Sequence, residues 1–316
     1  MNVPQSSLPM PIRKPNNVLL AAFAVVAVTL LPPAAAGAEP TPGTPMIYGR
    51  GETGGGSPDV RRLRMRLVQP QKAQYPGPRP VVVLLHGGGF THGSYTGTGI
   101  MRLAALLADR GIAAASIEYR LQRSSPIPSP RVQRLLDASI RTKAALDRGS
   151  VVAAAVDDTL TALEFLRKHG RKLRINRHQI GLVGDSAGAA TANHVAYVLD
   201  DHGVKRPAIR FVGSLWGTML ITPPRRPNRS PMGQIEAGEP PLFLVHGTLD
   251  KSVLCPPSHS AAMAARAERE GIETRYLELA GRGHGFGRSG FFSPDRSSGK
   301  SPADELVQFA LYHLGR

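Results

Sequence analysis

IGLVGDSAGAA, residues 180–190, runs from an apolar segment into a serine, Ser186, that has a glycine two positions to either side, and then into alanines. The apolar residues favour a strand and the alanines favour a helix. Gly184 and Gly188 permit a sharp turn between the two, which would expose the serine hydroxyl at the end of the strand. A tight structural turn accounts for the same residues. Ser186 is a candidate nucleophile if other residues of the chain supply a base, an acid and an oxyanion site.

Strands and helices alternate along most of the chain. Short apolar runs without a polar face are typical of strands buried on both sides of a sheet, and they occur at residues 81–85, 112–117, 180–183 and 242–245. Helical patterns lie at residues 100–110, 152–168, 187–199 and 259–270. This alternation predicts a doubly wound, mostly parallel sheet with helices on both faces. The alternating charged and apolar residues of RRLRMRLV, residues 61–68, predict a half-exposed antiparallel strand.

Two motifs supply the partners that a serine nucleophile needs, namely a base and an acid that orients it. HGTLD follows the apolar run at 242–245 and places Asp250 at the carboxyl end of that strand, and GRGHGF presents His284 in a glycine-rich loop. Taken singly, an Asx turn and a surface histidine explain these residues equally well. Serine, then aspartate, then histidine is the order of a hydrolase triad. We therefore predict Ser186, Asp250 and His284 as nucleophile, acid and base.

HGGGF, residues 86–90, directly follows the strand predicted at 81–85. Successive glycines let the backbone N–H groups turn toward a ligand, as an oxyanion requires. A phosphate-binding loop is the competing interpretation, but the lysine and hydroxyl that should follow its glycines are missing. We predict an oxyanion hole made by Gly88, Gly89 and Ala187, and expect His86 to brace the loop.

In combination, these motifs resemble the α/β-hydrolase superfamily, and within it the esterases similar to hormone-sensitive lipase and the secreted feruloyl-esterase-like enzymes. HGGGF, IEYRL, GDSAG, HGTLD and GHGF together cover nearly the whole of residues 60–316. The resemblance implies the α/β-hydrolase fold, assigns the triad and the oxyanion donors to the same residues, and implies that Tyr119 braces the site. The chain departs from the pattern in GDSAGA, where Ala189 replaces a glycine, and in the segment 122–150, which intervenes after YRL.

The first part of the chain has the composition of an export signal. Arg13 and Lys14 precede an uncharged apolar run at 18–31, and small residues then end at Ala38. The run is shorter than the roughly 20 residues that span a bilayer, so we expect cleavage after Ala38, with a retained anchor as the alternative. The mature protein is then secreted or periplasmic, without a stable membrane span.

The domain organisation follows from these boundaries. Residues 1–38 are predicted as a signal peptide, 39–59 as a flexible segment rich in proline and glycine, and 60–316 as the catalytic domain. Residues 122–150 read as an insertion over the sheet edge, with a helix at 132–146, and as a possible cap.

Charge and cysteine content exclude some functions. The chain has 316 residues, a formal charge of +16 and one cysteine, Cys255, so no intramolecular disulfide forms. No basic helix or aromatic pattern for reading bases is present, and we expect no nucleic-acid partner. No metal-ligand cluster such as H-E-x-x-H occurs, so we expect neither a metal nor a cofactor. A solvated surface explains most arginines, although an anionic ester is conceivable beside Arg123, Arg131, Arg134, Arg141 and Arg225.

The predicted function is a serine ester hydrolase that acts through an acyl-enzyme on a small-molecule or carbohydrate-linked ester. Three alternatives remain open. A peptidase of the same fold would usually carry an extra domain that filters peptides. About twenty residues separate the predicted cleavage site from the first predicted strand, which is too few for such a domain. An acyltransferase would use identical residues. A non-catalytic binding protein on this scaffold is expected to lack a triad member or an oxyanion glycine.

Overall fold

The computed structural model describes residues 43–54, 59–135, 143–220, 231–286, 290–294 and 299–315. The chain divides into two units, Met1–Ala38 and Glu39–Arg316. The predicted signal peptide and its cleavage site lie outside the described residues, as do Arg141 and Arg225. Export and localisation therefore stay predictions.

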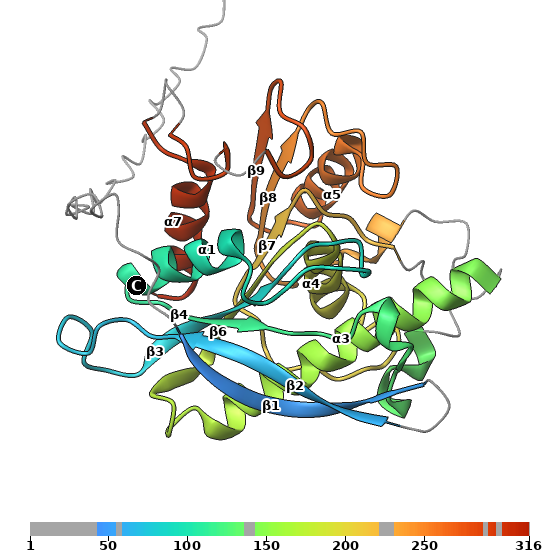
Figure 1. Cartoon of the computed structure of the whole chain (residues 1–316). Coiled ribbons are helices and arrows are strands. Elements are labelled where there is room, and N and C mark those ends of the chain that lie inside the picture. Colours follow the sequence, from blue (N-terminus) through green and yellow to red (C-terminus); the bar gives the residue numbers. More distant parts are fainter. Residues whose placement is uncertain are drawn as a thin grey trace, which may run out of the picture. The chain divides into compact units, whose positions relative to one another are not determined.

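A single sheet organises the described part of the second unit (Figure 1). Its nine strands lie in the order β5-β1-β2-β4-β3-β6-β7-β8-β9. Neighbours from β4 to β9 are parallel, whereas the β5-β1, β1-β2 and β2-β4 pairs are antiparallel. The strands are β1 (Thr44–Thr53), β2 (Asp59–Val68), β3 (Arg79–Leu85), β4 (Ala113–Ile117), β5 (Pro126–Ile127), β6 (Ile175–Asp185), β7 (Val212–Leu215), β8 (Leu242–Gly247) and β9 (Thr274–Leu279).

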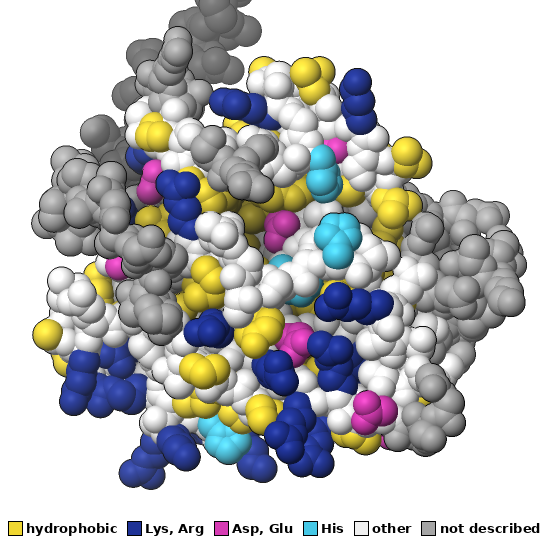
Figure 2. Space-filling view, viewed as in Figure 1, with side chains coloured by type: hydrophobic (Ala, Val, Ile, Leu, Met, Phe, Trp, Pro, Cys, Tyr) yellow, Lys and Arg dark blue, Asp and Glu magenta, His cyan; other side chains and the backbone are white. Residues whose placement is uncertain are grey.

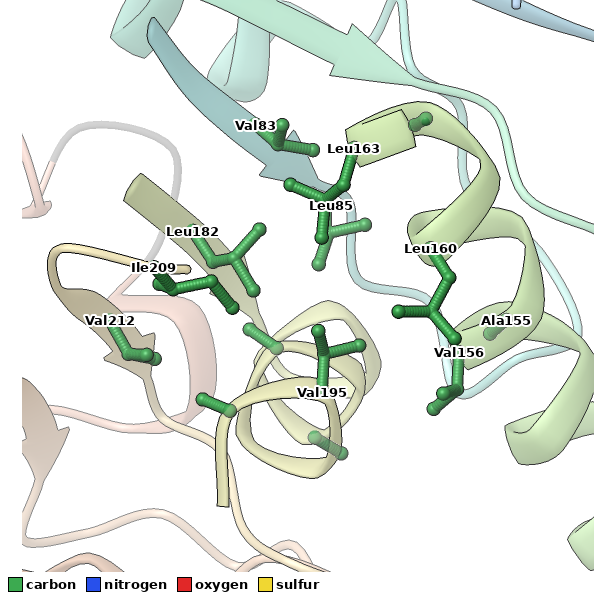
Figure 3. Packing of buried hydrophobic residues seen from close by; sticks show 14 of the residues in the cluster. Val83, Leu85, Ala155, Val156, Leu160, Leu163, Leu182, Val195, Ile209 and Val212 are labelled. Atoms are coloured by element: carbon green, nitrogen blue, oxygen red, sulfur yellow. The ribbon is translucent and has the colours of Figure 1, made fainter. Parts of the chain in front are cut away.

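Helices cover both faces of this sheet, as predicted (Figure 1). Alternate residues of β3 point to opposite faces, so Val82 and Leu84 pack in one cluster while Val83 and Leu85 pack in another. Figure 3 shows Val83 and Leu85 facing side chains such as Leu163. The first cluster includes α1 (Thr98–Asp109) and α7 (Pro302–His313), and the second includes α3 (Lys143–His169), α4 (Ala187–Tyr197) and α5 (Pro257–Arg269).

This architecture determines where the predicted site residues meet. Strands β3, β6 and β8 are parallel members of one sheet, so their carboxyl ends reach the same edge. HGGGF follows β3, Ser186 follows β6, and Asp250 follows β8 by three residues. Ligands of such sheets bind beyond the carboxyl ends of the strands. The fold thus brings these three loops together where a site is expected.

The structure corrects the flexible segment expected at residues 39–59. Thr44–Thr53 forms β1, which pairs with β2 along its length, with a register shift between Ile47 and Gly49. The domain therefore begins before residue 60. Proline and glycine in this segment signal a linker locally, but pairing with β2 and burial of Tyr48 satisfy the backbone and stabilise a strand.

The described part of residues 122–150 does not form a cap over Ser186. Pro126–Ile127 pairs with β1 at the sheet edge, and Ser129 donates its backbone N–H and its hydroxyl to Asp157 of α3. These bonds hold the segment to the edge and to α3. The helix α3 begins at Lys143, nine residues before the predicted start at 152, so part of the expected insertion belongs to this helix.

Among the described residues, no helix combines the length and the apolar composition that crossing a membrane requires.

Candidate active site

Ser186 occupies a strained turn between β6 and α4. Its backbone has φ 51° and ψ −114°, a conformation that a non-glycine residue adopts only when its surroundings enforce it. A Cβ on Gly184 would lie 2.3 Å from the carbonyl carbon of Gly188, and a Cβ on Gly188 would lie 2.0 Å from the carbonyl oxygen of Leu85. Both glycines are therefore required for the close packing of α4 against the strands. The turn holds the serine at the end of β6.

Ser186, His284 and Asp250 form one chain of hydrogen bonds. The Oγ of Ser186 lies 3.0 Å from Nε2 of His284, and Nδ1 of His284 lies 2.6 Å from Oδ2 of Asp250. The residues come from the start of α4, from a 3₁₀ turn (His284–Phe286) after β9 and from the loop after β8. The structure thus brings together all three predicted triad residues. In this arrangement the imidazole can accept the serine proton while the carboxylate holds its tautomer.

The Asp250 carboxylate has a second histidine partner. Nε2 of His246 lies 2.8 Å from the same Oδ2 atom, and Nδ1 of His246 lies 2.7 Å from Oγ of Ser260. The backbone N–H of Ser252 donates to Oδ1 over 2.8 Å. Burial by itself raises the pKa of Asp250, but the bonds from Ser252, His284 and His246 outweigh it and lower the pKa below its usual value. The carboxylate is held ionised.

His246 was not predicted from the sequence as a residue of the site. Its side chain is completely buried, and burial is the largest influence on its pKa, which is lowered although Asp250 opposes the change. It is therefore a neutral imidazole near pH 7, with one N–H to donate. The sequence contained one signal for this contact. His246 precedes Asp250 by four residues, and a turn brings residues at this spacing together.

The HGGGF loop has the conformation that only glycine adopts easily. Gly88 and Gly89 have φ values of 121° and 60°, and a Cβ on Gly88 would lie 2.1 Å from the carbonyl oxygen of His92. Gly88, Gly89 and Ala187 line the same cavity as Ser186 and His284. The predicted oxyanion donors are therefore on the cavity that contains the serine.

Asp185 connects the HGGGF loop to the serine turn through a hydrogen bond that was not predicted from the sequence. The backbone N–H of Gly87 donates to Oδ1 of Asp185 over 2.9 Å, and a Cβ on Gly87 would lie 2.4 Å from Oδ2. Burial raises the pKa of Asp185 to about 6, against the lowering effects of the Gly87 N–H and of His284. The position of Asp185 directly before Ser186 was the only signal in the sequence.

His86 and Tyr119 brace the HGGGF loop through hydrogen bonds to its backbone, as expected. Their rings stack with centroids 4.3 Å apart, and the Tyr119 hydroxyl donates to the His86 carbonyl oxygen over 2.6 Å. Nδ1 of His86 lies 2.7 Å from the carbonyl oxygen of Gly87. Burial lowers the pKa of His86, which keeps the ring neutral. Both side chains are bonded to the loop backbone.

The cavity beside Ser186 has a volume of about 640 Å³. Figure 2 shows a hollow near the centre of this face, with hydrophobic, acidic and histidine side chains around it. Apolar residues form much of its lining, namely Phe90, Ala190, Trp216, Leu220 and Leu254. Cys255 also lines it, but burial raises the pKa of its thiol, so it is not an activated nucleophile.

Three family models match successive parts of the chain. The α/β hydrolase fold model matches residues 150–243, the feruloyl-esterase-like BD-FAE model matches residues 65–133, and the prolyl oligopeptidase family model matches residues 216–307. Together with the sheet order and the serine turn, these matches identify the fold. The chain has the α/β-hydrolase fold.

Three proteins similar to this chain are named as ester-cleaving enzymes. The chain is 26% identical to Esterase LipI of Mycobacterium tuberculosis over 63% of this chain and 59% of LipI, and 28% identical to Esterase LipC of the same organism over 66% of this chain and 53% of LipC. The alignments thus span little more than half of either relative. The ethyl acetate hydrolase of Pseudomonas putida is 22% identical over 79% of both chains.

Solved structures share the fold of this chain. Esterase 2 of Thermogutta terrifontis in its native form aligns with a TM-score of 0.63 and 20% identity, covering 88% of this chain and 94% of that one. The propionate-bound form of the same esterase also has a TM-score of 0.63, at 21% identity, and covers 88% and 96% of the two chains.

The described arginines among those considered for an anionic ester, Arg123, Arg131 and Arg134, do not line the cavity beside Ser186. Arg131 is paired with Asp157 and Glu164, and Nη1 of Arg134 donates to the carbonyl oxygen of His202 over 3.4 Å. None of the described arginines lines the cavity beside Ser186. Within the ranges that the structure describes, no group of three or more His, Cys, Asp or Glu side chains is arranged to hold a metal.

Proposed function

We propose that the protein cleaves carboxylic esters with Ser186 as nucleophile, His284 as base and Asp250 as the acid that orients it. The observation that carries this proposal is the hydrogen-bonded chain from Ser186 through His284 to Asp250. It ends at a strained serine turn that faces a cavity of about 640 Å³. The esterase relatives support the same chemistry.

The proposed reaction has two half-reactions. Nε2 of His284 takes the Ser186 proton as Oγ attacks the ester carbonyl carbon, and the oxyanion accepts hydrogen bonds from the backbone N–H groups of Gly88, Gly89 and Ala187. The imidazolium then gives its proton to the departing alcohol, which leaves an acyl group on Ser186. Water, deprotonated by the same imidazole, attacks the acyl carbon; the bond to Oγ of Ser186 then breaks, the acid leaves, and the imidazolium returns its proton to Oγ. Asp250 stabilises the imidazolium in both halves.

The composition of the cavity supports a small ester with an apolar part. Apolar side chains make up much of the lining, and none of the described Lys or Arg side chains lines the cavity. Binding in such a pocket relies on apolar contact, with a few polar groups to orient the ligand. A carbohydrate-linked ester fits this proposal only if its sugar remains outside the cavity.

The test compares the protein with Ser186→Ala on acetyl, butyryl, octanoyl and feruloyl chromogenic esters. We expect a fall in kcat of about 10⁴-fold or more, as for other serine hydrolases that lose the nucleophile. A fluorophosphonate probe should label the protein once, on the peptide that contains Ser186, and should not label the variant. Hydrolysis that survives in Ser186→Ala would refute the proposal.

A peptidase activity is the second candidate, because the prolyl oligopeptidase family model matches residues 216–307, which include Asp250 and His284. The probe would label Ser186 in either case. Aminoacyl and dipeptidyl p-nitroanilides separate the two functions. Turnover of these amides with a kcat/KM above that of the esters would replace the esterase proposal with a peptidase.

We also propose that the protein is exported, which rests on the pattern of residues 1–38 alone. Sequencing the N-terminus of protein recovered outside the cytoplasm should give Glu39 as the first residue.

A further inference from the structure

A second cavity adjoins the one that contains Ser186. It has a volume of about 470 Å³ and lies between the carboxyl ends of β3 and β6, the first turns of α1 and the aromatic pair Phe291 and Phe292. Three residues line both cavities, namely Asp185, Trp216 and Gly285. Asp185 directly precedes the serine and Gly285 directly follows His284. The second cavity therefore begins beside the reacting groups.

The inner part of this second cavity is apolar. Its lining there consists of side chains with 7% exposure or less, namely Leu84, Leu85, Val183, Leu215 and Trp216. Asp185 is the acidic group among the lining residues, and its Oδ1 already accepts the N–H of Gly87. A pocket of this composition favours a hydrocarbon ligand, since an apolar ligand gains from leaving water and a polar one finds few partners.

The outer end of the second cavity is polar and open. Thr98, Gly99 and Arg102 line it and are exposed, and the guanidinium carbon of Arg102 lies 4.3 Å from the ring centroid of Phe292. An apolar chain can thus extend from the reacting groups toward solvent beside α1. The lining changes from apolar to polar along that direction.

Trp216 is held firmly at the junction of the two cavities. Its φ of 41° is unusual for a bulky side chain, and its backbone N–H donates to the Val245 carbonyl oxygen over 2.7 Å. The indole packs edge-on against Phe286 and Phe291, with centroids 4.7 and 5.6 Å apart. A strained residue persists only where its surroundings over-determine it, which gives the junction a defined shape.

We propose that the second cavity binds an aliphatic chain of the ester while the carbonyl group reacts at Ser186. This inference rests on the proposed esterase function and names its substrate class, an ester that carries a medium-length alkyl chain. The chain can belong to the acyl group or to the alcohol. Both have the same chemistry, and two substrate series tell them apart.

Gly99 offers a way to fill the second cavity without disturbing the backbone. A Cβ built on Gly99 meets no heavy atom within 4 Å, and the residue lies in the first turn of α1. Gly77 is a matched control, because its Cβ also meets nothing within 4 Å and the residue lines none of the cavities described above. Gly99→Phe and Gly77→Phe therefore add the same side chain in different places.

The experiment measures kcat/KM on p-nitrophenyl esters from acetyl to octanoyl and on acetate esters of alcohols from ethanol to octanol. Each buried methylene contributes about fourfold, so excluding two or more should lower the octyl-to-short preference of Gly99→Phe at least tenfold. The series in which the preference falls identifies the bound chain. Phe292→Ala enlarges the second cavity and should shift the preference toward longer chains in that same series.

The outcomes separate the two proposals. Suppose that the unchanged protein and Gly77→Phe are active and share one chain-length profile. If Gly99→Phe and Phe292→Ala both have that same profile in both series, the assignment of the second cavity is wrong. If the folded protein hydrolyses no ester in either series, the esterase proposal itself fails and the assignment fails with it. Thermal unfolding of each variant verifies that it is folded.

Discussion

Asp250 and Asp158 are both buried carboxylates with several hydrogen-bond donors, yet their surroundings differ in one decisive way. Asp250 accepts from His246, His284 and Ser252, and His284 continues to a serine on a cavity. Asp158 accepts from the backbone N–H and Nε of Arg120 and is 1% exposed. The first network therefore has an open end on the cavity, whereas Asp158 and Arg120 form a pair in which both side chains are 1% exposed.

The Arg120 cluster joins separate segments of the fold. Its guanidinium lies 2.8 Å from Asp158 and 3.2 Å from Asp157, and Nη1 donates to the carbonyl oxygens of Glu52 and Ile127 over 2.7 Å each. One buried cation thus connects β1, β5 and α3. Through Asp157 the cluster continues to Arg131 at the surface, but arginine keeps its proton. The cluster can therefore specify packing without transferring a proton, whereas a network that contains a histidine beside a serine can transfer one. Three predictions test that distinction.

The largest effect is expected at the open network. Asp250→Asn should lower kcat about 10⁴-fold, because the amide no longer stabilises the imidazolium or holds the productive tautomer of His284. The rate of ester hydrolysis and the midpoint of thermal unfolding should both be measured. We expect a large fall in kcat with only a small change in the midpoint of unfolding. A variant with one tenth of the original kcat would contradict the role given to Asp250.

The opposite pattern is expected at the Arg120 cluster. Asp158→Asn leaves the buried Arg120 without its main counter-charge and should cost about 3–5 kcal/mol in the free energy of unfolding. The folded fraction should keep its kcat. Glu164→Gln is the matched control, because Glu164 pairs with Arg131 while its side chain is 57% exposed, and its loss should cost about 1 kcal/mol or less. Equal losses in the two variants would show that burial does not decide the contribution.

The smallest effect of the three concerns His246, the buried residue that joins the open network to the core. His246→Phe removes one donor to a carboxylate, worth about 1.5–3 kcal/mol, and should lower kcat roughly 10- to 100-fold. Losing this donor also raises the pKa of Asp250, so the acid limb of the pH profile should move to higher pH.

A conservative replacement separates positioning from packing at the same residue. His246→Gln keeps an N–H donor and should retain more activity than His246→Phe, with a smaller shift of the acid limb. Equal activities and identical pH profiles in the two variants would mean that His246 only fills space.

Sequence patterns predicted the elements whose signals are local. The apolar run 81–85 is β3, and residues 98–109 form the helix predicted at 100–110. Strand β7 and helix α7 are among the elements that were not predicted. Strand β7 is only four residues long, Val212–Leu215, which is too short for a periodic signal. Helix α7 begins at a capping box in which Ser301 accepts from the Asp304 N–H and Asp304 accepts from the Ser301 N–H, a signal that Ser301 and Asp304 carry in the sequence.

By itself, the sequence determined the order of the motifs and the sharp turns at their glycines, because turn geometry and strand periodicity depend on neighbouring residues. These were sufficient to predict Ser186, Asp250 and His284 as partners. Only the tertiary structure decided which distant groups complete the site, namely the contacts of His246 with Ser260, of Asp185 with Gly87, and of the second cavity with α1. These contacts join segments that only packing of the whole sheet and its helices brings together, and no local pattern encodes them.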